Sequence, residues 1–320
     1  MSTQPSMQSL VQEYLENQRR CGFALASPGF QLMAFARFAD QSGHQGPLTQ
    51  RLILDWVQGQ RPSAPHAVWA ARLKVIRPFA RYRARFDSRT EIPDLRMFGK
   101  ASMRITPHIF TEQEIVDLLA AARAMRPRGK LRPVLYETLF GLLAATGLRI
   151  SEALQLRYAD IDPAPGALTV RQSKFSKSRL VPLHPTVCEA LQRYTTIRQL
   201  FAPVSPEAYL FVSRSGARLS RSTALSVFKQ LRADLKWTAR GDRALPRIHD
   251  LRHTFICRRI QRWYQQGADV DNRMAALSTY VGHSCISCTY WYLTGTPELM
   301  TVAARNFEQF AGKSRRDHHA

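Results

Sequence analysis

Near the C-terminal end of the sequence, the stretch HSCISCTYWYLTGTPEL combines several residue types that could carry out chemistry. His283, Cys285 and Cys288 have donor atoms that bind zinc, whereas Tyr290 and Tyr292 have hydroxyl groups that could act as nucleophiles. Residues two positions apart on a helix point about 200° away from each other, so only one of the two tyrosines could face a given substrate. The stretch by itself is compatible with a metal site or with a tyrosine nucleophile.

Two other segments contain an arginine that could bind an anion. In TGLRISE, Arg149 stands where we expect a helix to begin, and a guanidinium beside the exposed N–H groups of a helix start suits an oxyanion. The alternative is a local ion pair from Arg149 to Glu152. In IHDLRH, His249 and Arg252 are three residues apart and would share one face of a helix, so both could contact one anion. The alternative is an ordinary surface helix.

The elements that must position these residues are mostly helical. Four stretches before residue 87 repeat apolar residues every three or four positions, with breaks at glycine and proline. The following segment has prolines and no periodicity, as in a linker. Thr111 and Glu114 then have the spacing of a capping box, which predicts the start of a new helix. The expected domains are a helical domain at 1–88, a linker at 89–108, and a second domain at 109–320 that ends in a C-terminal helix.

In the second domain, one short β-hairpin is expected among the helices. An apolar helix from Val134 to Ala145 should end at Gly147. The stretch ALTVRQSKFSKSRLVPL alternates around a polar centre, which predicts two strands with Lys174 and Lys177 near the tip. The predicted fold class is therefore mainly α, with a small antiparallel sheet in the second domain.

The charge of the chain indicates a polyanionic partner. The 320 residues include 46 Lys and Arg against 24 Asp and Glu, a net charge of +22. A field of this sign favours nucleic acid or an anionic membrane face. One predicted helix of the first domain places basic residues between aromatic ones, and we predict that it faces DNA; the alternative is a solvated basic face over a packed aromatic stripe. Its DNA-contact candidates are Arg72, Lys74, Arg77 and Arg81, together with Lys177 of the hairpin.

The cysteines and the N-terminus favour a reduced, cytoplasmic protein. The five cysteines are odd in number and mostly far apart, which argues against a disulfide framework. The N-terminal stretch lacks the apolar segment of a signal peptide, and the most apolar run, LFGLLAATG, is too short to span a bilayer. A zinc site at His283, with Cys257 or His253 as a further ligand, remains an alternative, but the chain has no second close pair of ligands at zinc-finger spacing. We expect no metal and no cofactor.

Taken in order, these segments resemble the tyrosine recombinase (phage integrase) family. The family pattern is an Arg in G-L-R-x-S-E, a Lys in a β-hairpin, H-x-x-R, and G-H followed nine residues later by a nucleophilic Tyr. The resemblance spans roughly residues 110–311, while the first domain is similar only in layout to the family's helical core-binding domain. The positions that match the pattern are Arg149, Lys174, His249, Arg252, His283 and Tyr292.

This resemblance implies a role for each matching residue in cleaving DNA without a metal. Arg149 and Arg252 would hold the non-bridging oxygens of the scissile phosphate, and His283 would add a hydrogen bond. The remaining roles are assigned to Tyr292 as nucleophile, His249 as acceptor of its proton, Lys174 as donor to the leaving 5′ oxygen, and Glu152 as a residue that orients the site. Tyr290 would only pack.

The expected activity is site-specific DNA recombination through a covalent 3′-phosphotyrosyl intermediate, in the service of a mobile genetic element. The alternatives with the same chemistry are a Xer-type resolvase and a topoisomerase-like relaxer, and the alternative from another class is an inactive DNA-binding regulator. We expect double-stranded DNA and no membrane as partner, and a homotetramer on synapsed DNA, with other recombinase subunits as further partners. The final helix, 297–310, would dock on a neighbouring subunit or pack on its own domain.

Overall fold

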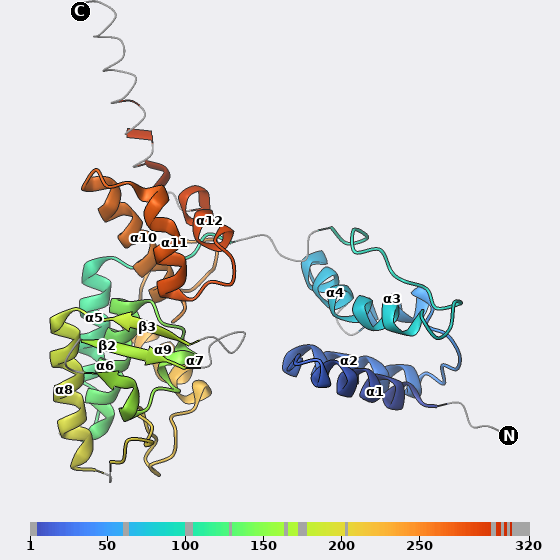
Figure 1. The fold of residues 1–320 in the computed structure, drawn as a ribbon, viewed down its shortest axis with the longest axis horizontal. Helices are drawn as coiled ribbons and strands as arrows, with labels where there is room; N and C mark the ends of the chain where they lie inside the picture. The colour runs from blue at the N-terminus through green and yellow to red at the C-terminus, as the bar shows by residue number, and fades with distance from the viewer. Residues whose placement is uncertain are drawn as a thin grey trace, which may run out of the picture. The chain divides into compact units, whose positions relative to one another are not determined.

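The chain consists of two compact units, Met1–Arg104 and Ile105–Ala320 (Figure 1). The structure is a computed structural model. The residues that it describes are 5–59, 64–99, 105–127, 130–162, 166–171, 178–201, 204–295, 299–301, 304–305 and 308. None of the helices in these ranges is both long and apolar enough to cross a membrane.

The first unit is a four-helix assembly with its own apolar core. Its helices are α1 (Met7–Arg20), α2 (Ala26–Gln41), α3 (Gln50–Gly59) and α4 (His66–Arg83). The apolar repeats of each helix turn inward, so that Phe35, Ile53 and Phe79 are completely buried. Ser6 begins α1 as an N-cap, because its side chain accepts a hydrogen bond from the main-chain N–H of Ser9.

The segment 89–108 contributes to both units. Glu91 donates its main-chain N–H to the carbonyl of Leu48, and the ring of Phe98 lies edge-on to Trp69 of α4, so both residues pack on the helical unit. Thr106 bonds instead to Asp242 in the second unit, through its own N–H and its carbonyl. The boundary set by contacts therefore falls between residues 104 and 105, inside the segment expected to be a linker.

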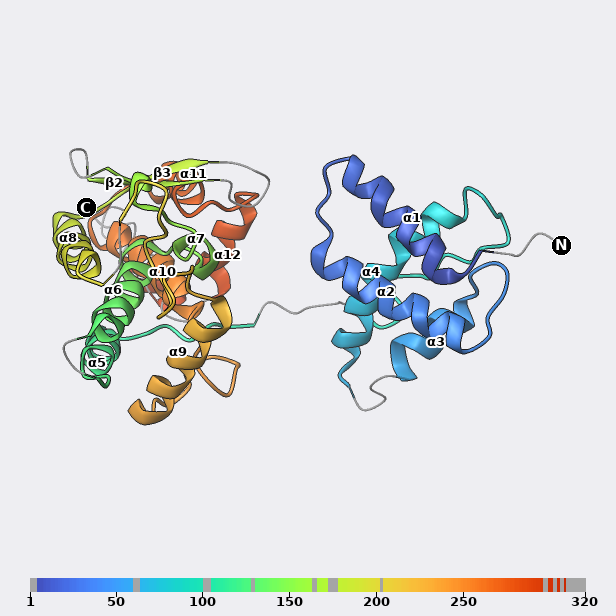
Figure 2. The same cartoon turned by 90° about the horizontal axis from the view of Figure 1, so that it is seen from below.

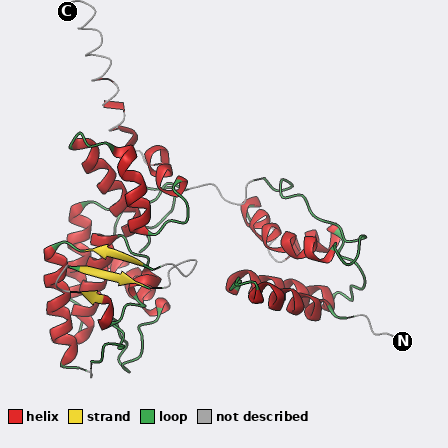
Figure 3. Ribbon diagram, in the orientation of Figure 1, coloured by secondary structure: helices red, strands yellow, loops and turns green. Residues whose placement is uncertain are grey.

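The second unit is mainly helical, with one small sheet, which confirms the predicted fold class. Figure 3 shows the strands of this sheet among the helices. The helices are α5 (Glu112–Arg123), α6 (Leu131–Thr146), α7 (Ile150–Ala153), the short 3-10 helix η1 (Tyr158–Asp160), α8 (Pro185–Gln199), α9 (Arg221–Leu235), α10 (Asp250–Gln265), α11 (Val270–Val281) and α12 (Ser287–Gly295). The antiparallel sheet has the order β1 (Ile161–Asp162), β2 (Ala167–Val170), β3 (Arg179–Pro182).

Helix α6 is the centre of this unit and contacts α5, α8 and α10 (Figure 2). Its apolar sequence buries Leu139 and Phe140 completely, as expected for a helix covered on several sides. The predicted capping box opens α5, where Thr111 and Glu114 bond to each other's main-chain N–H groups. At the other end, α6 stops at Gly147 in the left-handed conformation (φ +64°), as predicted.

The last three described helices form a separate apolar cluster that holds the aromatic C-terminal stretch. Ile256 and Ile260 of α10 pack in it with Met274 of α11 and Tyr292 of α12. This cluster lies beside the end of the hairpin, since α11 contacts β3. Most of the predicted final helix, 297–310, lies outside the described residues.

Candidate active site

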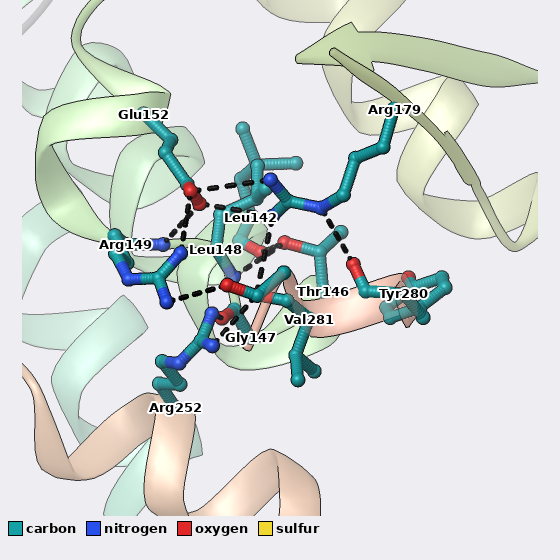
Figure 4. A network of polar contacts seen from close by, with 11 residues as sticks. Leu142, Thr146, Gly147, Leu148, Arg149, Glu152, Arg179, Arg252, Tyr280 and Val281 are labelled. Atoms are coloured by element: carbon teal, nitrogen blue, oxygen red, sulfur yellow. Dashed lines mark hydrogen bonds and ion pairs between the residues drawn. The ribbon is translucent and has the colours of Figure 1, made fainter. Parts of the chain in front are cut away.

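Three arginines from separate elements converge on the C-terminal end of α11 (Figure 4). Arg179 donates to the carbonyl of Tyr280 at 2.8 Å, Arg252 to that of Val281 at 2.6 Å, and Arg149 to that of Gly282 at 2.7 Å. The last carbonyls of a helix have no partner within the helix and carry its negative dipole end, so they favour cations. The three guanidinium groups therefore hold consecutive residues just before His283.

Glu152 of α7 holds two of these arginines in place. Its carboxylate is 6% exposed and pairs with Arg149 at 2.8 Å and with Arg179 at 3.0 Å. Burial by itself would raise the pKa of Glu152, but the bonds from Arg179 and from the main chain of Arg149 outweigh it and lower that pKa. The ion pair between Arg149 and Glu152, considered as an alternative to anion binding, is thus present and is part of a larger network.

Arg252 connects the two glycine turns of the site. It is 2% exposed and also donates to the carbonyl of Gly147 at 2.7 Å, which joins the TGLR turn to the end of α11. Burial first, and then the positive charge of Arg149, lower the pKa of Arg252 to about 10, so it remains a cation at neutral pH. Nearby charges that lower a pKa in this way also attract an anion.

Both turns require glycine. Gly147 (φ +64°) and Gly282 (φ +67°) lie in the left-handed region, where a Cβ atom is unfavourable. A Cβ on Gly147 would lie 2.6 Å from the ring of Phe255, and one on Gly282 would lie 2.8 Å from the guanidinium of Arg179. The glycines therefore allow an aromatic ring and an arginine to approach the main chain.

Tyr292 lies next to His283, and its hydroxyl is bonded to another histidine. The rings of His283 and Tyr292 are nearly parallel, with centroids 6.4 Å apart, and His283 is held by a 2.7 Å bond from Nδ1 to Thr289. The side chain of Tyr292 is 3% exposed, and its hydroxyl lies 2.6 Å from Nδ1 of His253. Tyr290 is only partly buried in the same cluster.

The pKa values of His249, the N-cap of α10, and of His253 within α10 are both lowered. His253 packs edge-on to His249, with ring centroids 4.9 Å apart. Burial, with further contributions from His249 and nearby cations, lowers the pKa of His253 to about 3. The pKa of His249 is also lowered, first by partial desolvation of its ring and then by the positive charge of Arg252. Solvent still reaches this residue at the N-terminus of α10. A neutral imidazole can exchange a hydrogen bond with a tyrosine hydroxyl in either direction.

Two residues of the site were not identified as such from the sequence. Arg179 begins β3, and its side chain, 9% exposed, reaches Glu152 and the end of α11. His253 was considered only as a metal ligand. One signal was available for it, because His253 lies four residues after His249 and therefore one helical turn away. Nothing in the local pattern around Arg179 distinguishes it from other arginines.

The predicted catalytic Lys174 and the predicted DNA-contact residue Lys177 lie outside the described residues. The strands on either side are described and form the predicted hairpin, with Val170 opposite Arg179. Arg179, at the start of β3, bonds to Glu152, so the first residue of this strand belongs to the arginine network. The hairpin itself is confirmed, while the roles of both lysines remain predictions.

The predicted DNA-contact residues of the first unit do not share one environment. Lys74, Arg77, Arg81 and Arg85 line one groove along α4, together with Tyr14 of α1. Arg72 is on another side of the helix, where it donates to the carbonyl of Val57 at 3.1 Å and stacks on the ring of Trp56. The groove is therefore lined by basic side chains, and their contact with DNA remains a prediction, while Arg72 contributes to the packing of α3 on α4.

The cysteines of the C-terminal stretch lie at the start of α12. The sulfur atoms of Cys285 and Cys288 are 3.0 Å apart and are not joined by a disulfide. In the described part of the chain, no three His, Cys, Asp or Glu side chains gather in an arrangement that could hold a metal ion.

Comparison with known proteins places these features in context. The model of the phage integrase family matches residues 108–298. The curated integrase/recombinase y4rB of Sinorhizobium fredii is 41% identical over 306 residues, which cover 93% of this chain and 96% of that protein. Tyrosine recombinase XerD of Caulobacter vibrioides is 32% identical over 236 residues, which cover 73% of this chain and 72% of that protein.

Solved structures share the fold. The Tn1549 transposon integrase in complex with transposon right end DNA has a TM-score of 0.68 at 17% identity and covers 96% of this chain and 100% of that chain. The XerH site-specific recombinase bound to a palindromic difH substrate has a TM-score of 0.67 at 17% identity, with 94% of this chain and 85% of that chain covered.

Proposed function

The chain belongs to the phage integrase family of tyrosine recombinases, and we propose that it cleaves and rejoins DNA through a covalent 3′-phosphotyrosyl intermediate on Tyr292. The observation that carries this proposal is the proximity of one buried tyrosine hydroxyl to a cluster of fixed cations. The ring of Tyr292 lies parallel to that of His283, and the three carbonyls directly before His283 accept hydrogen bonds from Arg179, Arg252 and Arg149. Such a site stabilises the negative charge that builds up when an oxygen nucleophile attacks a phosphodiester.

In the proposed reaction, Arg149 and Arg252 bind the non-bridging oxygens of the scissile phosphate. Arg149 bonds to Glu152 and to one carbonyl, and Arg252 bonds to two carbonyls. Each guanidinium carries five N–H donors, so both arginines can also donate to a phosphate. The carbonyls and Glu152 fix the guanidinium planes of Arg149 and Arg252 in advance. Little reorganisation is therefore needed when negative charge develops on the phosphate oxygens. His283, whose ring lies parallel to that of Tyr292, adds a further donor.

The oxygen of Tyr292 forms the new bond to phosphorus, and the 5′ oxygen of the DNA leaves. The tyrosine proton goes to a histidine. His249 is the candidate from the resemblance, and His253 is the ring that contacts the hydroxyl in this structure. The leaving oxygen takes a proton from Lys174, the candidate from the resemblance. Attack by a second DNA 5′ hydroxyl on the phosphotyrosine reverses these steps, so strands are exchanged without ATP.

For the biological role, we propose recombination in the service of a mobile genetic element in the cytoplasm. The support is the identity of 41% to a protein named an integrase/recombinase, which exceeds the 32% to a XerD. The fold is also shared with the Tn1549 transposon integrase, whose structure was solved in complex with transposon right end DNA. The partner is double-stranded DNA, and the assembly is a homotetramer on synapsed DNA. A Xer-type resolvase has the same chemistry and is the second candidate.

The test is a DNA duplex that carries the recognition site with a nick next to the cleavage position, so that the cleaved fragment diffuses away and the covalent complex accumulates. We expect a protein–DNA band that resists denaturation, in buffer with a chelator and no added metal. Binding without such a band would identify a DNA-binding regulator instead. Relaxation of supercoiled plasmid without recombinant product would identify a relaxing enzyme, and exclusive recombination between sites on one molecule would favour a resolvase.

A further inference from the structure

The two cysteines of the C-terminal stretch have no role in the proposed reaction, yet they lie directly before the nucleophile. Cys288 is in the first turn of α12, four residues and thus about one helical turn before Tyr292. Between them, Thr289 holds His283 by a 2.7 Å bond. A change in the conformation of this turn would therefore affect both His283, through Thr289, and Tyr292, one helical turn later.

The geometry of the pair fits a reversible disulfide. The sulfur atoms are 3.0 Å apart, about 1 Å more than an S–S bond. The main-chain N–H of Cys288 bonds to the carbonyl of Cys285 at 3.2 Å, so the turn that brings the sulfurs together is already formed. Two cysteines separated by two residues at the N-terminal end of a helix are the arrangement of dithiol oxidoreductases, in which the helix end favours the thiolate.

The two thiols also differ in access, as a stepwise exchange requires. Cys285 is exposed and can be reached by a small disulfide from solution, whereas Cys288 is partly covered and lies within reach of the Cys285 sulfur. Among the other cysteines, Cys257 is buried in α10 and Cys188 is partly covered in α8, while Cys21 is exposed but belongs to the first unit. Cys285 is therefore placed to react first with an oxidant, and Cys288 to complete the bond.

We propose that Cys285 and Cys288 form a reversible disulfide that restrains the start of α12 and thereby slows attack by Tyr292. With glutathione disulfide as oxidant, the Cys285 thiolate attacks one sulfur and releases one glutathione. The Cys288 thiolate then attacks the Cys285 sulfur and releases the second glutathione. The two electrons and both thiol protons of the protein end on the two glutathione molecules.

The effect on Tyr292 follows from its burial. Its side chain is 3% exposed and its hydroxyl is bonded to His253, so the residue must shift before its oxygen can meet a phosphate from solution. A cross-link within the turn that precedes α12 removes conformations of that turn, and the helix that carries Tyr292 loses the freedom to shift. This inference rests on the proposed role of Tyr292 in DNA cleavage.

The experiment compares the full-length protein after incubation in reduced glutathione and in glutathione disulfide. Peptide mass spectrometry should show that the peptide containing both cysteines loses two hydrogens on oxidation. Single-turnover formation of the covalent complex on the nicked duplex should become about tenfold slower, corresponding to about 1.4 kcal/mol on the barrier, and dithiothreitol should restore it. Cys285→Ser should keep the rate of the reduced protein under both conditions, and Cys21→Ser should respond like the wild type.

Two results would overturn the inference: glutathione disulfide modifies Cys21 but yields no disulfide between Cys285 and Cys288, or the disulfide forms and the cleavage rate is unchanged. Failure of the proposed function is recognised separately, because the reduced wild type would then form no covalent complex at all. In that case amide hydrogen exchange across residues 286–292 still tests whether the disulfide restrains the start of α12. Exchange should be slower in the oxidised protein, and equal exchange in both forms contradicts the restraint.

Discussion

At the residue scale, burial separates the two tyrosines of the C-terminal stretch. Tyr292 lies against His253 and His283, whereas Tyr290 is partly exposed on another side of α12. We therefore expect Tyr292→Phe to abolish the covalent complex while DNA affinity persists, because the substitution removes only the hydroxyl. Tyr290→Phe is the matched control and should keep the complex. Denaturing electrophoresis on the nicked duplex measures both, and a covalent band from Tyr292→Phe would disprove the assignment of the nucleophile.

The half-buried imidazole of His253 should make the stability of the protein depend on pH. Its folded-state pKa of about 3 lies below the value of about 6.5 expected in the unfolded chain. As pH falls below about 6.5, the unfolded chain therefore binds the proton first, and unfolding becomes easier until the pH reaches about 3. Between pH 7.5 and 5.5, this group should lower the free energy of unfolding by about 1 kcal/mol.

The comparison that measures this contribution is urea unfolding of the wild type and of His253→Gln at both pH values. Glutamine does not titrate, so the variant should lose less stability than the wild type between pH 7.5 and 5.5. His184→Gln, which changes an exposed histidine at the start of α8, is the control. An equal pH dependence of the wild type and His253→Gln would mean that His253 is not held neutral in the folded protein.

Arg179 is a positioning residue, since it acts through Glu152 and the end of α11. Arg179→Lys keeps the charge but not the planar fork that reaches the carboxylate and two carbonyls. We expect the rate of covalent-complex formation to fall by about tenfold or more with DNA affinity nearly unchanged, because binding uses many phosphates and cleavage uses one. Arg157→Lys, in the exposed pair with Glu207, should leave the rate unchanged. Equal losses in the two variants would contradict a positioning role.

At the element scale, the end of α11 depends on a glycine for two separate reasons. Gly282→Ala puts a Cβ into the left-handed region and against Arg179. Gly267, just after α10, has nearly the same φ of +64° but no atom within 4 Å of an added Cβ. We expect Gly267→Ala to cost about 1 kcal/mol for the backbone alone, and Gly282→Ala about 2 kcal/mol or more. Denaturant unfolding measures the loss in free energy of unfolding for both variants. Equal losses would show that Arg179 moves away from the added Cβ without an energetic penalty.

For the whole molecule, the positive charge should appear as a salt-dependent affinity for DNA. Lys74 and Arg81 line the basic groove of α4 and are exposed, so we expect them to neutralise phosphates. Replacing either by Gln should reduce the slope of log affinity against log salt by about 0.9 and weaken binding to any duplex sequence. Arg51→Gln is the control, because Arg51 is exposed on α3 and does not line the groove, so its replacement should leave the slope unchanged. A slope unchanged by both groove variants would place the DNA elsewhere.

The amino-acid pattern was sufficient for the features that depend on neighbouring residues. The capping box of Thr111, the stop of α6 at Gly147 and the hairpin around residues 167–182 are all local, because each is formed by hydrogen bonds or side-chain alternation over a few positions. The mainly α fold class was predicted from such local patterns, and the phage integrase family from the resemblance of several motifs; both predictions are confirmed. The roles of the catalytic residues remain predictions that the proposed experiments test.

The contacts that assemble the site depend on tertiary folding. Arg179 meets the carbonyl of Tyr280 across 101 positions, and His253 meets Tyr292 across 39. Neither partner is marked in the local pattern, because an arginine at the start of a strand and a histidine on a helix have the same local preferences whether they face solvent or a buried hydroxyl. Only the packing of α10, α12 and β3 around α11 brings these groups together and shields them from water. This shielding strengthens the ion pairs of the arginines and lowers the pKa of His253.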